Sequence, residues 1–229
     1  MEVWSLSAED HICLLCGCNR AALFHMDRWR PYLRCPDCLL VYVPIRWHPS
    51  ADEAKRRYDL HQNRPNDTGY REFLNRLVEP LAARLPSGAQ GLDFGAGPGP
   101  TLSLLFSERG FPVKNYDPLY ADDRSLLNTT YDFVSCTETV EHFTRPDVDW
   151  KRLIRLVKPG GLLGVMTARL EAGRDFGRWR YVNDRTHVGF YSTQTLEWLA
   201  MKYGLKADFV APTVVLFAVP RCQDSASGR

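Results

Sequence analysis

The 229-residue chain has no apolar run long enough to span a bilayer, no internal repeat and no low-complexity tract. Its first ten residues contain polar and acidic residues where a secretory signal needs a basic start and an apolar stretch. A surplus of one charge is also missing, because 29 Lys and Arg residues are balanced by 27 Asp and Glu residues. These absences predict a cytoplasmic protein without a membrane partner, and they argue against a nucleic-acid partner without excluding one.

Cysteine is present in a number and spacing that do not suit a secreted disulfide framework. Seven cysteines leave one unpaired, and Cys13, Cys16, Cys35 and Cys38 form two Cys-x-x-Cys pairs separated by 18 residues. This is the spacing of a closed, tetrahedral structural zinc site. Disulfides are the alternative, and a reducing compartment disfavours them. Cys18, beside the first pair, could replace one ligand.

The remainder of the chain alternates between strand and helix patterns. Alternation of this kind predicts an α/β fold with a mostly parallel sheet covered by helices on both faces. The predicted strands are 91–94, 113–116, 132–136 and 162–167, with a closing hairpin of 206–210 and 213–219. The predicted helices are 50–58, 70–81, 101–110, 147–157 and 193–203.

A glycine-rich turn follows the first of these strands, in the segment QGLDFGAGPG. Gly95, Gly97 and Gly99 allow the backbone to approach a nucleotide-like ligand closely. The dinucleotide fingerprint needs a glycine at the sixth position, where this chain has Pro100, so binding of NAD is disfavoured. Asp93 places a carboxylate at the carboxyl end of the strand. A carboxylate there suits a ligand with an ammonium group better than a pyrophosphate.

A second carboxylate strengthens the same hypothesis. Asp117 ends the next strand, roughly 20 residues beyond the glycine turn, where an acidic side chain accepts hydrogen bonds from ribose hydroxyls. The structural alternative is a tight left-handed turn that only ends an ordinary strand. Together, the turn and the two aspartates favour a cofactor site.

Four segments carry a family resemblance: LDFGAGPG, the YDP strand end, YDFVSCTETVEHF and LVKPGGLLGV. Residues 68–220 resemble the class I S-adenosylmethionine-dependent methyltransferases, in particular the ubiquinone-pathway enzymes and the methyltransferase types 11 and 23. The resemblance implies a Rossmann-like, doubly wound sheet and S-adenosyl-L-methionine as cofactor. The cofactor-binding residues it implies are Tyr70, Asp93, Phe94, Gly95, Ala96, Gly97, Gly99, Asp117, Pro118, Cys136, Thr137 and Glu138.

The chain departs from this family between its second and third motifs. Too few residues separate Asp117 from Tyr131 for a full helix and strand. The third strand of the family is therefore expected to be shortened or missing.

The cysteine-rich segment, residues 13–44, resembles the zinc-ribbon heads that precede some methyltransferase domains, including sugar C-methyltransferases and a ribosomal RNA guanine methyltransferase. The expected organisation is a small zinc ribbon over residues 1–46 and a helical connector or cover over 47–67. A methyltransferase domain over 68–220 and a disordered tail over 221–229 follow.

The segment TETVEHF should face the methyl donor, because it follows a strand of the parallel sheet. If it is helical, Glu138, Glu141 and His142 share one face, where two carboxylates and an imidazole favour a divalent cation. The pattern is similar to that of ubiquinone-pathway and small-RNA 2′-O-methyltransferases, which hold magnesium or manganese there, and His187 is placed to complete such a site. In many relatives a similar turn needs no metal, and the same residues only line the pocket.

His187 has two further interpretations. It is either a general base, since its ordinary pKa of about 6.5 lies near neutral pH, or a packed loop histidine. The insert RDFGRWRYVNDRTH (residues 174–187) contains Trp179, Tyr181, Arg178, Arg180 and Arg185, which form either a lid that clamps the substrate or a packed aromatic cluster with solvated arginines.

These observations predict an S-adenosylmethionine-dependent methyltransferase acting on a small hydroxylated or sugar-like molecule, with metal-assisted O-methylation as one mechanism. The alternatives are an RNA methyltransferase whose zinc ribbon binds RNA, a non-catalytic scaffold that binds S-adenosylmethionine, and a dehydrogenase with an unusual glycine turn.

Overall fold

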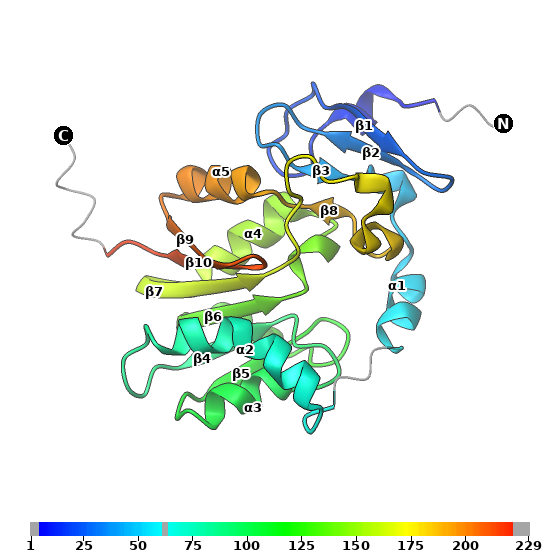
Figure 1. Cartoon of the computed structure of the whole chain (residues 1–229). Helices are drawn as coiled ribbons and strands as arrows, with labels where there is room; N and C mark the ends of the chain where they lie inside the picture. Colours follow the sequence, from blue (N-terminus) through cyan, green and yellow to red (C-terminus); the bar gives the residue numbers. More distant parts are fainter. Residues whose placement is uncertain (1–4, 61–63, 222–229) are drawn as a thin grey trace, which may run out of the picture.

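The structure is a computed structural model that describes residues 5–60 and 64–221. Residues 61–63 of the expected connector and residues 222–229 of the expected tail lie outside the described residues. The described residues form a six-stranded sheet and a smaller four-stranded sheet (Figure 1).

The large sheet has the strand order β5-β4-β6-β7-β10-β9. Its strands are β4 (Gly91–Phe94), β5 (Val113–Tyr116), β6 (Tyr131–Thr137), β7 (Val157–Met166), β9 (Lys206–Ala211) and β10 (Val214–Ala218). The pairs β4/β5, β4/β6 and β6/β7 are parallel, whereas β10 runs antiparallel to β7 and β9. This confirms the predicted α/β class, the mostly parallel sheet and the closing hairpin.

Helices cover both faces of this sheet, as predicted (Figure 1). The helices α2 (Thr68–Ala82) and α3 (Thr101–Ser107) lie on one face, and α4 (Pro146–Arg155) and α5 (Thr193–Tyr203) lie on the other. Successive side chains of a strand point to opposite faces, so Phe133 packs with Phe106 of α3 and Val134 joins the core cluster that contains Trp150 of α4.

Strand β5 is the edge of the sheet. The segment 117–130 that joins β5 to β6 contains a 3-10 helix, η3 (Arg124–Asn128), and an isolated bridge between Asp117 and Ala121, but no strand of the large sheet. The expectation that the third strand is shortened or missing is therefore confirmed within the described residues.

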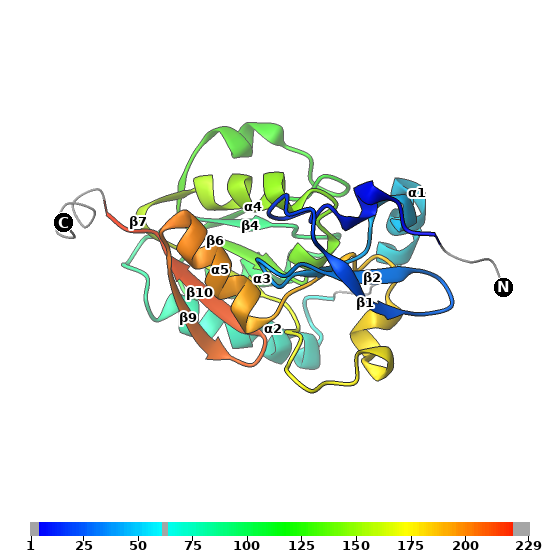
Figure 2. The same ribbon diagram turned by 90° about the horizontal axis from the view of Figure 1, so that it is seen from above.

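The small antiparallel sheet joins two distant parts of the chain. It contains β1 (Ala22–Met26), β2 (Pro31–Arg34), β3 (Val41–Tyr42) and β8 (Gly189–Phe190). Figure 2 shows this sheet at one end of the molecule, close to the insert after β7. Side chains of the insert complete its core, among them Phe176 and Val182. The packing thus crosses the expected boundary at residue 46, and the domain division stays a prediction.

Short helices surround this sheet. They are η1 (Ala8–His11), η2 (Ile45–Trp47), η5 (Phe176–Arg178) and η6 (Arg180–Asn183). The predicted connector helix is α1 (Ala51–Tyr58), and the Ser50 hydroxyl accepts a hydrogen bond from the Glu53 amide at 3.3 Å. At the other end of the chain, Gly204 ends α5 in the left-handed conformation, as expected from its position.

Candidate functional site

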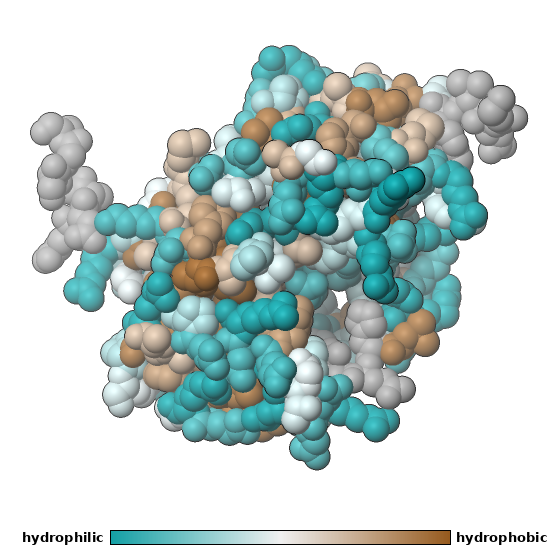
Figure 3. All heavy atoms as spheres, in the orientation of Figure 1, coloured by the Kyte–Doolittle hydropathy of each residue, from teal (hydrophilic) through white to brown (hydrophobic). Residues whose placement is uncertain are grey.

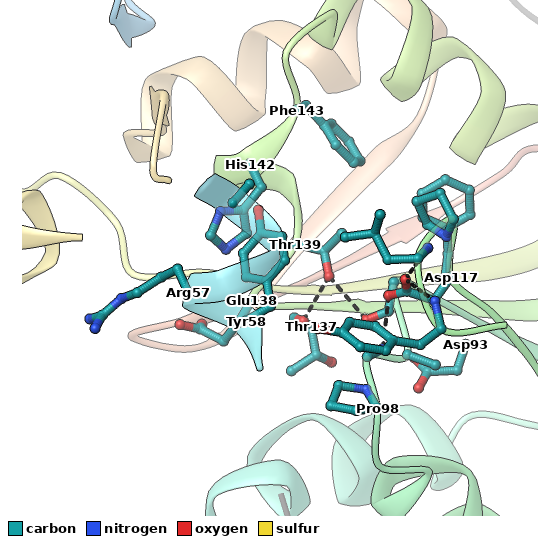
Figure 4. A pocket seen from close by; sticks show the side chains of 18 of the residues that line it. Arg57, Tyr58, Asp93, Pro98, Asp117, Thr137, Glu138, Thr139, His142 and Phe143 are labelled. Carbon is teal, nitrogen blue, oxygen red and sulfur yellow. Dashed lines mark hydrogen bonds between the residues drawn. The ribbon is translucent and has the colours of Figure 1, made fainter. Parts of the chain in front are cut away.

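A cavity of about 890 Å³ lies beyond the carboxyl ends of β4, β5 and β6. Ligands bind at this edge in open parallel sheets. In Figure 4, Asp93 and Asp117 lie toward one end of the cavity, and His142 and Arg57 lie toward the other. We call these ends, together with the residues directly behind their walls, the glycine-loop half (residues 93–99 and 117–120) and the histidine half (residues 57–58, 141–142 and 180–187).

Most predicted site residues line this one cavity. They are Tyr70, Asp93, Phe94, Gly95, Ala96, Gly97, Gly99, Asp117, Pro118, Thr137, Glu138, His142 and His187. Cys136 and Glu141 are not among the lining residues, because both are fully buried behind the wall. Cys136 packs in the hydrophobic core beneath the sheet edge.

The glycine turn is shaped by its neighbours in the protein. Gly95 has a φ of +81°, and a Cβ atom there would lie 2.4 Å from both Cγ2 and Oγ1 of Thr139. Gly97 also has a positive φ, but a Cβ atom there would meet no atom within 4 Å. Gly95 is therefore required by both its backbone conformation and the closeness of Thr139, which the sequence pattern did not reveal.

Asp93 is a buried carboxyl group on the cavity wall, with only 4% of its surface exposed. Burial raises its pKa to about 7; the hydrogen bond from Ser135 Oγ, at 2.9 Å, opposes this shift and the charge of Asp117 adds to it. A cation bound against Asp93 would favour the ionised carboxylate. This position therefore suits the ammonium group that the sequence analysis expects.

Asp117 holds the glycine turn in place. Its Oδ2 accepts a hydrogen bond from the Gly97 amide at 2.9 Å, and its Oδ1 accepts from the amides of Leu119 and Tyr120 at 2.8 and 3.2 Å. A carboxylate oxygen can accept two hydrogen bonds, so Oδ2 retains capacity for a ligand hydroxyl. Its role toward a ribose stays a prediction.

The end of β6 lies between the two halves of the cavity. Thr137 Oγ1 is buried and has no hydrogen-bond partner among the described residues. Glu138 follows with a φ of +47°, and its pKa is raised well above the usual range by burial and by the charge of Glu141. A ligand in the cavity would meet both side chains.

The histidine half contains a compact group of three possible metal ligands. One ligand atom from each of Glu141, His142 and His187 lies within 4.8 Å of the others. The first two belong to the 3-10 helix η4 (Val140–His142), and His187 comes from the segment before β8. Glu138 is not part of this group, because its left-handed backbone precedes η4 and does not extend a helical face.

Hydrogen bonds orient both imidazole rings. His142 Nδ1 lies 2.9 Å from the Thr186 carbonyl oxygen, and His187 Nδ1 lies 2.7 Å from the Tyr181 carbonyl oxygen. A carbonyl only accepts, so Nδ1 carries the proton in the neutral ring and Nε2 has a free lone pair. Burial lowers the pKa of His187, although the charge of Glu141 opposes this shift, which favours the neutral form.

The carboxylate of Glu141 is held by two hydroxyl groups. Thr167 Oγ1 donates to Oε2 at 3.1 Å, and the Tyr181 hydroxyl donates to Oε1. Burial, together with the charge of Glu141, raises the pKa of Tyr181 well above its usual range, so its hydroxyl stays protonated. Such hydrogen bonds to a ligating carboxylate are a common feature of metal sites.

The four cysteines of the paired motifs also come together. The sulfur atoms of Cys13, Cys16, Cys35 and Cys38 all lie within 4.8 Å of one another, with Cys13–Cys38 at 3.5 Å and Cys16–Cys35 at 3.4 Å. A disulfide requires about 2.05 Å, whereas sulfurs around a tetrahedral zinc with bonds of about 2.3 Å lie about 3.8 Å apart. The donor set fits zinc, and Cys18 is not in this group.

Comparison with known proteins identifies the family to which the part of the chain with the cavity belongs. A family model described as a methyltransferase domain matches residues 66–208, which is more than half of the chain. The chain belongs to the methyltransferase domain family. The matched segment includes the glycine turn, both aspartates and the Glu141–His142–His187 group.

Two curated relatives share part of this methyltransferase domain. The ubiquinone biosynthesis O-methyltransferase of Colwellia psychrerythraea is 35% identical over 92 residues, which cover 40% of this chain and 37% of that protein. The enzyme of the same name from Proteus mirabilis is 31% identical over 85 residues, which cover 37% of this chain and 35% of that protein. The chain thus spans little more than a third of the length of these relatives.

Solved structures show that the fold is shared. The 1,6-didemethyltoxoflavin-N1-methyltransferase of Burkholderia thailandensis has a TM-score of 0.52 at 13% identity and covers 86% of this chain and 99% of that chain. A phosphoethanolamine N-methyltransferase of Haemonchus contortus in complex with S-adenosyl-L-methionine has a TM-score of 0.50 at 14% identity, covering 66% of this chain and 52% of that chain. At these identities the likeness supports the class I methyltransferase fold alone.

In the described part of the methyltransferase chain, no helix has both the length and the apolar character needed to cross a membrane.

The insert of the methyltransferase domain contributes partly to the cavity wall and partly to the core of the small sheet, and its role as a lid stays a prediction. Arg180 and Tyr181 line the cavity, whereas Trp179 stacks on Tyr181 and packs against Phe176 in the core of the small sheet. Arg178 and Arg185 do not line the cavity.

The sequence analysis missed Asp184. Its carboxylate accepts hydrogen bonds from Thr186 and pairs with Arg57 of α1 at 3.0 Å. Burial raises the pKa of Asp184, but the bonds from Thr186 and Arg57 outweigh this effect and hold it well below the usual range. The short spacing Asp-x-Thr is typical of such a turn and is the one local signal for this residue.

Proposed function

We propose that the chain is an S-adenosylmethionine-dependent methyltransferase that methylates a hydroxyl oxygen of a small hydroxylated or sugar-like molecule. The observation that carries this proposal is the continuity of the cavity. It joins a glycine turn flanked by Asp93 and Asp117 to two histidines whose Nε2 atoms are free. A methyl donor in the first half would lie next to an acceptor in the second.

The glycine-loop half fits S-adenosylmethionine by its chemistry. When bound, this cofactor supplies an electrophilic methyl group on a sulfonium sulfur. The Asp93 carboxylate would accept hydrogen bonds from its ammonium group, and Asp117 would accept one from a ribose hydroxyl. Thr137 Oγ1 would offer its unused hydrogen bond. The two structural relatives carry S-adenosylhomocysteine or S-adenosyl-L-methionine, which supports the same cofactor here.

The histidine half would orient and deprotonate the acceptor. A neutral His187 can take the hydroxyl proton at Nε2, because its Nδ1 already donates to the Tyr181 carbonyl. Tyr58, whose ring contacts His142, and Arg180 form the wall against which the acceptor would pack. The curated relatives named as O-methyltransferases support oxygen as the accepting atom.

As the alternative to a His187 base, Glu141, His142 and His187 would hold a divalent metal ion, and the Nε2 lone pair of His187 would then bind the metal instead of accepting the proton. Two imidazoles and one carboxylate suit manganese, iron, cobalt or zinc better than magnesium, which prefers oxygen ligands. The metal would lower the pKa of the acceptor hydroxyl. The sequence-based expectation of magnesium and of Glu138 as a fourth ligand stays a prediction. At the four cysteines we propose a structural zinc ion.

The test combines binding and turnover. Calorimetry of the purified, zinc-loaded protein should detect binding of S-adenosylhomocysteine. Incubation with labelled S-adenosylmethionine and cell extract, with and without a chelator that spares the cysteine site, should yield a methylated product identified by mass. Binding without any labelled product from extracts would favour the non-catalytic scaffold, and absence of binding would refute the proposal.

An RNA acceptor is the second candidate, and one surface observation favours it. Trp29 is 47% exposed, and the guanidinium groups of Arg28 and Arg185 lie over its ring, at 4.6 and 5.0 Å from the ring centroid. Figure 3 shows hydrophobic side chains over this cysteine-rich end of the molecule. Arginines beside an exposed aromatic ring are typical of single-stranded RNA binding. RNA affinity that falls steeply with salt, and is lost in Trp29→Ala, would support this candidate.

A further inference from the structure

The cysteine-rich segment is connected to the histidine half through the backbone. Strand β3 pairs with β8 through Val41 with Phe190 and Tyr42 with Gly189. The pairing continues as the Val43 amide donates to the Val188 carbonyl at 2.9 Å, and the Val188 amide donates to the Glu141 carbonyl at 2.8 Å. A line of hydrogen bonds therefore runs from the residues after Cys38 to a member of the metal-ligand group.

A buried arginine makes a second connection. Arg30 precedes β2 and has only 1% of its surface exposed. Its Nη1 donates to the Arg185 carbonyl at 2.6 Å, and its Nη2 donates to the Asp184 carbonyl at 3.2 Å. Its Nε donates to the Tyr32 hydroxyl at 3.0 Å, which in turn donates to Asp27 Oδ2 at 2.7 Å. The planar guanidinium thus holds two successive carbonyls from one fixed position.

The carbonyls held by Arg30 belong to the turn that orients the histidines. Asp184 Oδ1 accepts hydrogen bonds from the amide and hydroxyl of Thr186, at 3.0 and 2.6 Å. The Thr186 carbonyl oxygen in turn accepts a hydrogen bond from Nδ1 of His142. His187 is the next residue in the chain. Since a buried charged group is costly to leave without partners, Arg30 and this turn restrict each other to one arrangement.

We propose that Arg30 is a positioning residue for the histidine half, and that the cysteine-rich segment supports the acceptor site through it. The guanidinium fixes residues 184–186, which supply the carbonyl that orients the His142 ring and hold the His187 backbone, whose amide donates to the Asp184 carbonyl at 3.1 Å. The glycine-loop half has no such contact, because Arg30 bonds only to residues of the small sheet and this turn. The proposal rests on the proposed function in one respect, that the Nε2 atoms serve an acceptor or its metal ion.

The test is Arg30→Lys, with Arg34→Lys as the matched control. Lysine keeps the charge but cannot hold two carbonyls from one plane. Arg34 is an exposed residue at the end of β2, so its change leaves the turn untouched. Both variants should retain one zinc per chain and bind S-adenosylhomocysteine within about threefold of the natural protein.

Arg30→Lys alone should weaken Mn²⁺ binding, titrated by electron paramagnetic resonance on zinc-loaded protein, by about tenfold or more. Hydrogen exchange at the amides of Thr186, His187 and Val188 should also become about tenfold faster, while exchange in β4 stays the same. Unchanged Mn²⁺ affinity together with unchanged exchange in Arg30→Lys would overturn the proposal.

A milder variant covers the case in which Arg30→Lys does not fold. Tyr32→Phe keeps the packed ring and removes the hydroxyl that joins Arg30 to Asp27. Tyr32→Phe should also weaken Mn²⁺ binding and speed exchange at the amides of residues 186–188, by smaller factors. If neither changes, the positioning role is refuted. If the natural protein binds no Mn²⁺, the proposed metal site is refuted, and if it binds no S-adenosylhomocysteine, the proposed function is refuted. In either case the exchange rates alone decide the role of Arg30.

Discussion

The two halves of the cavity are built in different ways. The glycine-loop half comes from two short segments, 93–99 and 117–120, which lie side by side because β4 pairs with β5. The histidine half consists of residues from α1, η4, the insert and the loop before β8. The cysteine-rich segment contacts it through the hydrogen bonds of Arg30. The first half is thus determined by local backbone geometry, and the second depends on long-range packing.

Loss of zinc should produce the largest difference between the two halves of the cavity in their ligand affinities. Cys35→Ser removes one of four ligands, and because structural zinc sites contribute several kcal/mol to folding, we expect the melting temperature to fall by about 10 °C or more. Below that melting temperature, affinity for S-adenosylhomocysteine should change less than Mn²⁺ affinity. The control is Cys18→Ser, which lies outside the group of four and should retain zinc. If Cys35→Ser lost affinity for S-adenosylhomocysteine and for Mn²⁺ equally, the two halves would not depend on the cysteine-rich segment to different degrees.

Gly95→Ala should have the opposite effect, because it should weaken binding in the glycine-loop half and not in the histidine half. The new Cβ would lie 2.4 Å from two Thr139 side-chain atoms, so the turn must move and affinity for S-adenosylhomocysteine should fall by about 100-fold, measured by calorimetry. Gly173→Ala is the control, because Gly173 has a similar φ of +77° and no atom within 4 Å of its Cβ position.

The double variant Gly95→Ala/Thr139→Ala sharpens this test. Removing Oγ1 and Cγ2 of Thr139 relieves the closest contacts and should restore part of the affinity. No recovery would mean that the positive φ of Gly95, rather than the contact, determines the requirement for glycine.

Glu141→Gln tests which side chains form the metal site. We expect Mn²⁺ affinity to fall by about 100-fold, because the charged member of the three-residue group is lost. Glu138→Gln should lower Mn²⁺ affinity by less than about threefold, since Glu138 lies outside the group and its raised pKa favours the neutral acid. Comparable losses in both variants would instead support the four-ligand set expected from the sequence.

The same contrast explains what could be predicted from the sequence. Glycine spacing and the positions of Asp93 and Asp117 are local signals, and the cavity contains every predicted cofactor residue except Cys136. The alternating strands and helices, and the missing third strand, were predicted for the same reason. By contrast, β8 has only two residues, and it is a strand because β3 pairs with it.

Arg30 and Asp184 carry no pattern of their own that would mark them as neighbours. The hydrogen bond between them joins residues 154 positions apart, and their roles follow from the docking of the small sheet. Glu138 also could not be placed from the sequence. It was expected to share a helical face with Glu141 and His142, but the helix η4 begins two residues after it.

The smallest expected effect is a pH dependence confined to the glycine-loop half. With the pKa of Asp93 at about 7 in the unliganded protein, about nine-tenths of its carboxyl groups are ionised at pH 8 and about one-tenth at pH 6. Affinity for the ammonium-bearing S-adenosylhomocysteine should therefore fall about tenfold between pH 8 and pH 6. Isothermal calorimetry at several pH values measures this change.

The accompanying stability effect has the opposite sign. Because the native pKa of Asp93 is raised above that of the unfolded chain, its contribution to the stability of the unliganded protein is present at low pH and is lost as the pH rises through about 7. A bound ammonium group reverses this trend by stabilising the ionised form. Asp93→Asn should bind more weakly at pH 8 and lose both pH dependences, and a variant that kept the tenfold fall would show that the titrating group is not Asp93.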